Sequence, residues 1–210
     1  MTDKQAQDAL FNLVDALASE DRARSLPELS LSPFFERKWS SIYEALEDGI
    51  IDTKALQHVF IKHLPERQSV PLIAVDGSNI PRPKSRTSED RSAQYVRNTS
   101  ESAKPVTYGW QFSTVVALPP QPGSGTYVLD QRRVTTRATP IQVAEEQLRH
   151  LAPPLAKETM ALLDRGYDST WLWCRLSALP IRGSLIRLKG NRCFFRPAPP
   201  PTGNRGAARK

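Results

Sequence analysis

Two aspartates follow short apolar segments and are themselves followed by small or polar residues. Asp76 comes after the run PLIAV, and Asp164 comes after TMALL. Such runs bounded by turn residues are typical of buried strands, and neighbouring strands lie about 4.8 Å apart. Two carboxylates at such strand ends can share a divalent cation, and Mg²⁺ prefers oxygen ligands. A single aspartate after a strand is more often a turn or helix cap, so the repeated pattern carries the hypothesis.

Five strands are predicted between residues 70 and 189, because apolar runs there are bounded by turn residues. They cover residues 70–75, 108–118, 126–134, 159–163 and 184–189. The second and third strands are joined by the turn-rich PPQPGSG and should form an antiparallel pair.

Two helices are predicted between these strands. In the first, Thr139 is a good N-cap, a proline follows it, Gln142 completes a capping box, and the helix runs to about Leu151. The second spans residues 168–179 with Asp168 as its cap. The resulting order is three strands, helix, strand, helix, strand, with one acid after the first strand and one after the fourth. This order predicts a mixed α/β sheet of the ribonuclease-H-like kind.

Four segments resemble, in order and spacing, the catalytic domain of bacterial DDE transposases of the insertion-sequence type. They are IAVDGSNIPRP, YGWQFSTVVALP, LLDRGYDSTWLW and IRLKGNRCFFRPAPPPTG, within residues 70–210. The run DRGYDS is the most specific, since many transposases of this group carry a similar run at the second catalytic acid. The resemblance implies that Asp76 and Asp164 are catalytic carboxylates that bind Mg²⁺, with Mn²⁺ as a substitute. The implied reaction is attack of water or a 3′-hydroxyl on a phosphodiester.

The third acid of such a triad lies on a helix beyond the last strand, and no Asp or Glu follows Asp168 here. Asp168 itself is expected to cap a helix. We therefore expect an incomplete transposase domain, inactive alone, which resulted from a frameshift, a stop codon or a partial copy. The alternative is a non-catalytic protein that binds transposon ends or inhibits full-length transposase. A two-carboxylate glycosidase would not explain the basic C-terminal fifth.

The positive charge is concentrated near the C-terminus. Residues 169–210 contain nine Arg and Lys and no acid, whereas the rest of the chain contains 20 basic and 22 acidic side chains. Such a patch favours a polyanion, because each neutralised phosphate releases counterions. DNA of transposon ends is the expected partner, together with full-length transposase or a second copy of the chain. The candidate phosphate contacts near the proposed site are Arg165, Arg187, Lys189 and Arg192.

The composition, with 39 % hydrophobic and 24 % charged residues, indicates a chain that folds in water. No apolar run is long enough for a membrane span, so a cytoplasmic, nucleoid-associated protein is expected. Cys174 and Cys193 are interpreted as ordinary thiols, and the three histidines have no metal-ligand spacing. The tryptophans of the predicted strands and helices are expected in the core; they are Trp110, Trp171 and Trp173.

Residues 1–68 are predicted to form a small helical unit without a clear helix-turn-helix signature. Its first apolar stripe is Leu10, Leu13, Val14 and Leu17; its second is Phe34, Phe35, Trp39, Ile42, Tyr43 and Leu46.

Gly49 is the expected stop of the second helix, and Asp52 or Thr53 the expected cap of the third. The boundary to the catalytic domain, residues 69–196, is placed near 65–70. Within that domain residues 79–105 are poor in apolar side chains and should form a long exposed loop, and residues 197–210 should be a disordered tail.

Overall fold

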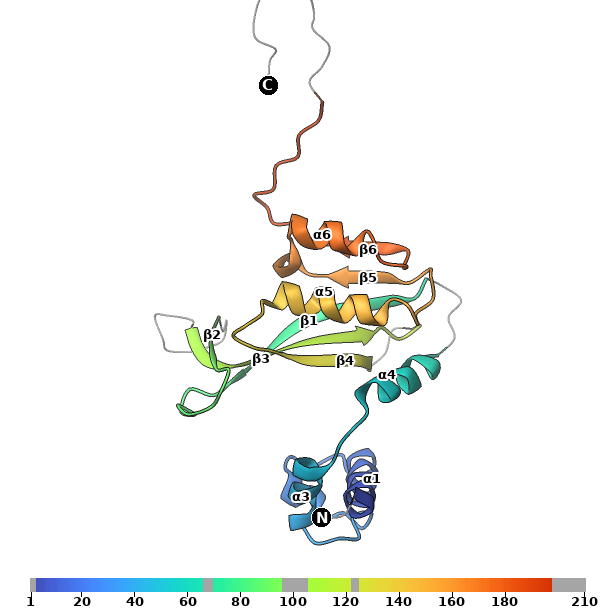
Figure 1. The fold of residues 1–210 in the computed structure, drawn as a ribbon, viewed down its shortest axis with the longest axis vertical. Coiled ribbons are helices and arrows are strands. Elements are labelled where there is room, and N and C mark those ends of the chain that lie inside the picture. Colours follow the sequence, from blue (N-terminus) through green and yellow to red (C-terminus); the bar gives the residue numbers. More distant parts are fainter. Residues whose placement is uncertain (1–2, 66–69, 96–105, 122–124, 198–210) are drawn as a thin grey trace, which may run out of the picture. The chain divides into compact units, whose positions relative to one another are not determined.

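The computed structural model describes residues 3–65, 70–95, 106–121 and 125–197, and Figure 1 shows their elements. The chain divides into two compact units between Leu56 and Gln57. The sequence pattern placed this boundary later, near residues 65–70. The division falls earlier because Ile61 and Leu64, at the end of a helix and just after it, pack against the core of the second unit.

Four helices precede the sheet in the described part of the chain; three were predicted from the sequence, and the short second helix was not. They are α1 (Asp3–Ser19), α2 (Leu26–Leu29), α3 (Ser40–Asp48) and α4 (Thr53–Lys62).

The expected ends of α3 and α4 are confirmed. Gly49 is the C-cap of α3 and donates its N–H to the carbonyl of Ala45. A carboxylate oxygen of Asp52 accepts hydrogen bonds from the backbone N–H groups of Lys54 and Ala55, at 3.1 and 3.0 Å. Asp52 therefore satisfies backbone donors at the start of α4, and it is the cap rather than Thr53.

The core of the first unit uses smaller side chains than the sequence pattern predicted. Val14 and Leu17 of the expected stripe are exposed, and only Leu13 of that stripe is buried. The buried face of α1 instead carries three alanines at helical spacing, Ala6, Ala9 and Ala16.

Alanine lets a neighbouring helix approach closely, which the search for large apolar residues overlooked. In the second expected stripe Phe35 and Ile42 are buried, while the other four members are exposed: Phe34, Trp39, Tyr43 and Leu46.

The second unit contains one mixed sheet of six strands. They are β1 (Leu72–Pro81), β2 (Ser92–Tyr95), β3 (Val106–Ala117), β4 (Tyr127–Val134), β5 (Met160–Leu163) and β6 (Gly183–Ile186).

The strand order is β2-β3-β1-β5-β6, and β4 also pairs with β3. β3 is antiparallel to β1, β2 and β4, whereas β1, β5 and β6 are mutually parallel neighbours. The five predicted strands and the antiparallel pair are confirmed, and the order matches the expected ribonuclease-H-like mixed sheet.

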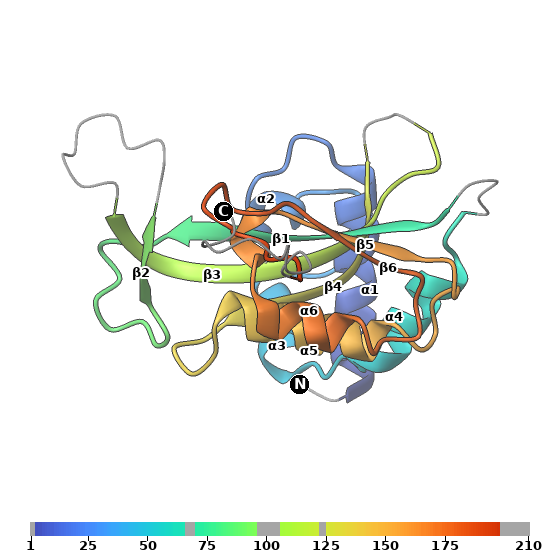
Figure 2. The same cartoon turned by 90° about the horizontal axis from the view of Figure 1, so that it is seen from above.

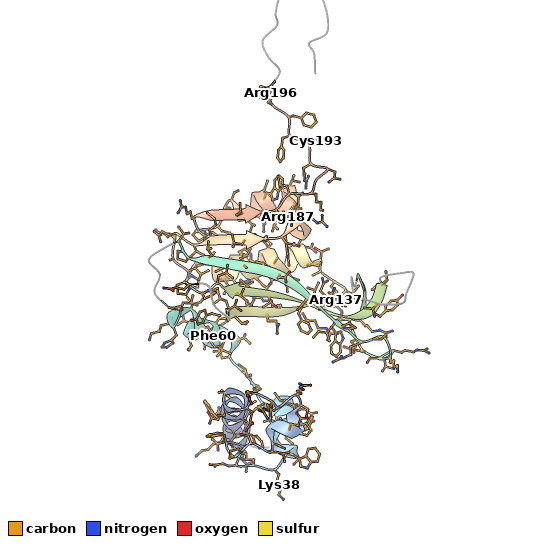
Figure 3. All side chains as sticks on the ribbon, turned by 180° about the vertical axis from the view of Figure 1, so that it is seen from behind. Lys38, Phe60, Arg137, Arg187, Cys193 and Arg196 are labelled. Carbon is orange, nitrogen blue, oxygen red and sulfur yellow. The ribbon has the colours of Figure 1, made fainter. Side chains whose placement is uncertain are left out.

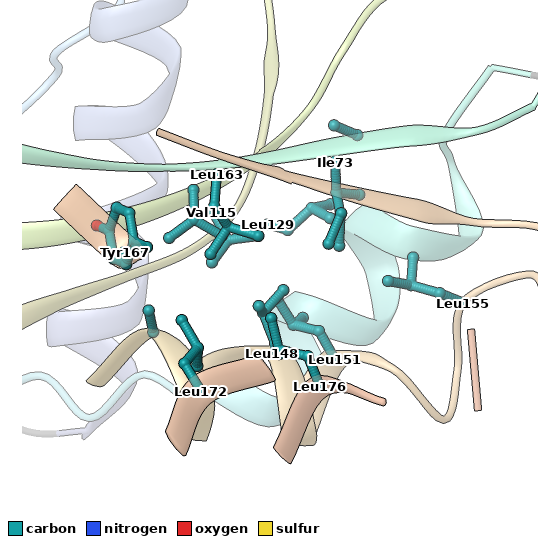
Figure 4. Close-up of a cluster of buried hydrophobic side chains, with 14 residues drawn as sticks. Ile73, Val115, Leu129, Leu148, Leu151, Leu155, Leu163, Tyr167, Leu172 and Leu176 are labelled. Carbon is teal, nitrogen blue, oxygen red and sulfur yellow. The ribbon is translucent and has the colours of Figure 1, made fainter. Parts of the chain in front are cut away.

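Helices α5 (Pro140–Leu151) and α6 (Thr170–Leu176) lie side by side on one face of this sheet, as Figures 1 and 2 show. The predicted capping box is present, because Thr139 and Gln142 each bind the backbone N–H of the other. Leucines of both helices pack against strand residues such as Val115 and Leu163 (Figure 4). This core fixes the central strands relative to the two helices.

The loop expected over residues 79–105 contains more structure than predicted. β1 continues to Pro81, and residues 92–95 form β2. Backbone pairing with β3 holds these polar segments, so they need few apolar side chains. Residues 96–105 and residues 198–210 of the predicted tail lie outside the described residues.

No helix within the described ranges is long and apolar enough to cross a membrane.

Candidate active site

The structure places Asp76 and Asp164 at matching positions on two neighbouring parallel strands. β1 and β5 pair from Leu72 with Met160 to Val75 with Leu163. Asp76 and Asp164 are the residues that directly follow the last of these pairs. Neighbouring strands lie about 4.8 Å apart. Both side chains are exposed. The predicted pair of acids is therefore brought together by backbone register, and its role as a metal ligand stays a prediction.

The two aspartates are held in different ways. Asp76 lies within β1, opposite Thr114 of β3, and has no hydrogen-bond or ion-pair partner among the described residues. Asp164 directly follows β5, and one of its carboxylate oxygens accepts a hydrogen bond from the backbone N–H of Gly166 at 2.7 Å. A Cβ atom on Gly166 would lie 2.9 Å from that oxygen. The glycine of the DRGY run is therefore needed for the observed position of the Asp164 carboxylate.

Tyr167 lies beneath this pair, at one end of the hydrophobic core (Figure 4). Burial raises the pKa of its phenol to about 12, against an opposing hydrogen bond with the Ser113 side chain. The negative charges of Asp76 and Asp164 raise this pKa further. One hydroxyl thus senses both carboxylates, and it stays protonated at neutral pH.

A buried polar chain continues from this hydroxyl into the fold. Ser113 Oγ donates to Gln147 Oε1 at 2.6 Å, and Gln147 Nε2 donates to the Ser113 carbonyl at 3.0 Å. The sequence analysis missed this chain, although a glutamine on the buried face of α5, beside Leu148, was a visible signal.

Asp168 is not the N-cap of α6, which corrects the prediction. Its side chain is fully buried and accepts the Lys189 N–H at 2.8 Å and Arg192 Nε at 3.0 Å. α6 begins after Ser169 without a side-chain cap. The hydrogen bond from Arg192 lowers the pKa of Asp168, and the Lys189 N–H and both positive charges act in the same direction against burial.

Arg192 therefore differs from the surface cation that the sequence suggested. Its guanidinium binds the carboxylate and carbonyl of Asp168 and lies 5.0 Å from the ring centre of Trp173. It anchors the segment after β6 to the fold.

The three other predicted DNA contacts are exposed. Arg165 directly follows Asp164 in the chain. Arg187 follows β6, is labelled in Figure 3, and donates its N–H to the carbonyl of Leu163, next to Asp164. Lys189 uses only its backbone N–H for Asp168. Arg165 and Arg187 thus place positive charge close to Asp164 in the fold.

The tryptophans are less buried than predicted. Trp171 is 46 % exposed, so its assignment to the core was wrong. Trp110 and Trp173 are half-buried and lie against arginine side chains. Cys174 and Cys193 are free and exposed thiols.

The described residues contain no group of three or more His, Cys, Asp or Glu that could hold a metal ion. The pair Asp76 and Asp164 still offers exposed carboxylate oxygens, the ligand type that Mg²⁺ prefers while it keeps several waters. The donor set therefore fits one hard divalent ion.

A mixed sheet of this order, with one acid inside β1 and a second directly after the neighbouring strand β5, is consistent with a ribonuclease-H-like nuclease domain. The family model of the DDE superfamily endonucleases matches residues 1–210, and the chain belongs to that superfamily. Its members are nucleases of the transposase type that act on DNA and generally depend on a divalent metal. A search of curated proteins finds no match.

Proposed function

We propose that this chain is a DDE-type transposase of the insertion-sequence type, in which Asp76 and Asp164 are the catalytic carboxylates. The observation that carries the proposal is the register of β1 and β5, which puts the two aspartates side by side. The match to the DDE superfamily endonucleases and the DRGYDS segment that begins at Asp164 also support this proposal.

The proposed cofactor is Mg²⁺, held by the carboxylates of Asp76 and Asp164, with Mn²⁺ as a substitute. When bound, such an ion polarises the phosphodiester and favours deprotonation of the attacking hydroxyl. The Gly166 N–H orients the Asp164 carboxylate, and the nearby Tyr167 hydroxyl stays protonated and adds no negative charge to the pair. The side chains proposed to contact phosphates of the transposon end are Arg165, Arg187 and Lys189.

We also propose that this chain alone binds DNA but does not cleave or join it efficiently. Two carboxylates supply ligands for one ion, whereas two-metal sites hold a pair of ions about 3.5 to 4 Å apart. Within the described residues no third ligand joins the pair, and no acid follows Asp168 in the sequence. A poorly fixed nucleophile and leaving group cost orders of magnitude in rate.

The test uses the purified chain with supercoiled plasmid in Mg²⁺ and in Mn²⁺. We expect retarded plasmid without cleavage in Mg²⁺ and slow nicking in Mn²⁺, which tolerates poorer geometry. Asp76→Asn and Asp164→Asn should abolish the nicking. Glu158→Gln, an exposed acid just before β5, is the matched control and should not change it.

Efficient cleavage in Mg²⁺ would overturn the proposed inactivity, and nicking that survives both aspartate substitutions would overturn the proposed site. A second function is a non-catalytic DNA-binding protein that inhibits full-length transposase; it is favoured because no third His, Cys, Asp or Glu joins the pair among the described residues. It predicts no nicking in either metal, with DNA binding unchanged by Asp76→Asn.

A further inference from the structure

A basic arm extends from the sheet beyond the acids. It consists of residues 77–81 of β1, residues 82–91, β2 and residues 106–110 of β3. Residues 96–105, between β2 and β3, are not among the described residues and are not part of this definition. Figures 1 and 2 show it projecting past α5 and α6. Because β1 runs unbroken from Asp76 to Pro81, Arg82 lies about 20 Å further along this strand.

A row of aromatic side chains on β3 organises arginines from three places in the sequence. Tyr108 and Trp110 are two residues apart and therefore lie on the same face of β3. The guanidinium carbons of Arg82 and Arg133 lie 5.5 and 4.8 Å from the centre of the Trp110 ring. That of Arg91 lies 5.4 Å from the centre of the Tyr108 ring. Stacking on aromatic rings restricts these flexible cations before any partner binds.

The segment 82–91 is fixed to the sheet by hydrogen bonds of several kinds. Trp110 Nε1 donates to Ser88 Oγ at 3.0 Å, and Arg133 donates to the carbonyl of Glu89. Asp90, with a positive φ of 52°, accepts from the hydroxyl of Thr136 at 3.0 Å.

Arg91 donates to the carbonyls of Arg82 and Pro83, at 3.1 and 3.0 Å. A Cβ atom on Gly109 would lie 2.2 Å from the Ile80 carbonyl oxygen, so the two strands at the base of the arm are close enough to require a glycine. The segment is thus a built surface with a defined conformation.

The charge of this surface is strongly positive. Residues 82–91 contain four cations and two acids, Glu89 and Asp90, and two further cations, Arg133 on β4 and Arg137 just after it, lie near Asp90. The Asp90 carboxylate accepts hydrogen bonds from the N–H and the hydroxyl of Thr136. The exposed cations are Arg82, Lys84, Arg86 and Arg137, and Figure 3 labels Arg137 on the side of the sheet from which the arm extends.

We propose that the basic arm binds the phosphate backbone of duplex DNA, at a distance from the acids of about 20 Å. This length corresponds to about six base pairs, since ten base pairs span about 34 Å. The inference rests on the proposed function, because it takes the DNA at Asp76 as its reference point. Restrained guanidinium groups match phosphate oxygens, and a row of cations with one sign matches a polyanion.

The test measures affinity for a fluorescent 20-base-pair duplex by anisotropy, without divalent metal and over a range of salt concentrations. The arm variant combines Arg82→Gln, Lys84→Gln and Arg86→Gln. The matched control removes three exposed lysines outside the arm: Lys54→Gln, Lys62→Gln and Lys157→Gln. Both variants lose three charges, and both are compared with the wild type in melting temperature.

We expect the arm variant to lose roughly tenfold or more in affinity at moderate salt, with a slope of log affinity against log salt that is smaller by about 2.7. The control should keep the wild-type slope. If the arm variant melts at a lower temperature, the single Arg86→Gln variant replaces it, because the Arg86 side chain makes no hydrogen bond or ion pair with the residues that the structure describes. Its slope should fall by about one.

Equal affinity of the arm variant and the control would overturn the proposal. The proposal would also be overturned if the arm variant lost binding to polyglutamate, used in place of an acidic protein, while its affinity for the duplex stayed unchanged. Nicking in Mn²⁺ separates the two proposals. If nicking depends on Asp76 but the arm substitutions do not change binding, only the proposal for the basic arm is contradicted. If binding depends on the arm but no nicking occurs, only the proposed catalytic site is contradicted.

Discussion

Asp164 and Asp168 are four residues apart in one segment, and they have opposite surroundings. Asp164 is exposed, and its hydrogen bond comes from the next turn of its own chain. Asp168 is fully buried and accepts a backbone N–H and the guanidinium of Arg192. The single turn of Arg165–Tyr167 between them sends the first acid to the surface and the second into the fold. A carboxylate saturated by internal donors stabilises structure, whereas one with open oxygens is available for chemistry.

The charge around each acid differs in the same sense. Asp168 is neutralised by Arg192, while Asp164 faces the like charge of Asp76 across two paired strands. Like charges so close are unfavourable for folding unless a cation joins them. The first acid therefore tolerates a local cost that the second avoids, which is the pattern expected of a functional site beside a structural anchor.

Removing the buried acid should have the largest effect. Asp168→Ala removes the carboxylate that accepts from the Lys189 N–H and from Arg192 Nε. We expect the melting temperature to fall by roughly 5 to 10 °C. Asp164→Ala should change it far less. Thermal unfolding followed by circular dichroism measures both, and equal losses would remove the distinction between the two acids.

Acid titration should sharpen the same contrast. The pKa of Asp168 is lowered in the fold, so its stabilisation is complete above its ordinary value of 3.8 and is lost as pH falls through the folded pKa. Urea unfolding between pH 2.5 and 6 should show a stability gap between wild type and Asp168→Asn that closes below about pH 4. A gap that is constant over this range would contradict the role of the charged form.

Alkaline titration addresses the hydroxyl that lies beneath the exposed pair. The pKa of Tyr167 is raised from 10.0 to about 12, so its stabilisation is complete below pH 10 and is lost as pH rises toward 12. Solvent near the carboxylates screens part of the effect, and we expect a loss of about 2 kcal/mol. Tyr167→Phe should not show this loss. A variant that loses stability in parallel with the wild type would assign the effect to other groups.

The smallest effect is expected for Asp164→Asn. It relieves repulsion with Asp76, so the melting temperature without divalent ions should rise by about 1 °C. Any rise that Mn²⁺ gives the wild type should disappear in this variant but persist in Glu158→Gln. Differential scanning fluorimetry with and without Mn²⁺ makes the measurement, and an unchanged Mn²⁺ response would place the ion elsewhere.

Local signals allowed much of the fold to be predicted. The capping box at Thr139 and the apolar runs before Asp76 and Asp164 involve residues close in sequence. The structure has the corresponding elements, α5, β1 and β5. The partner of Asp168 lies 24 residues away, so no local pattern could separate its role from that of a cap.

Tertiary pairing also explains the missed part of the sheet. Residues 92–95 form β2 through backbone bonds to β3, which their polar side chains do not reveal. The alanine face of α1 was missed for a related reason, because small residues matter only once a neighbouring helix is present.

The pairing of β1 has a mechanical consequence. Up to Val75 the strand is bonded to β3 on one side and β5 on the other, and beyond Val75 it keeps β3 alone. Asp76 is thus the first residue of β1 that is paired on one side only. From there to Pro81 the strand can bend and twist more than the part that is paired on both sides. A displacement of residues 77–81 is therefore transmitted along the strand to the backbone of Asp76. The position of this acid depends on what binds at the far end of β1.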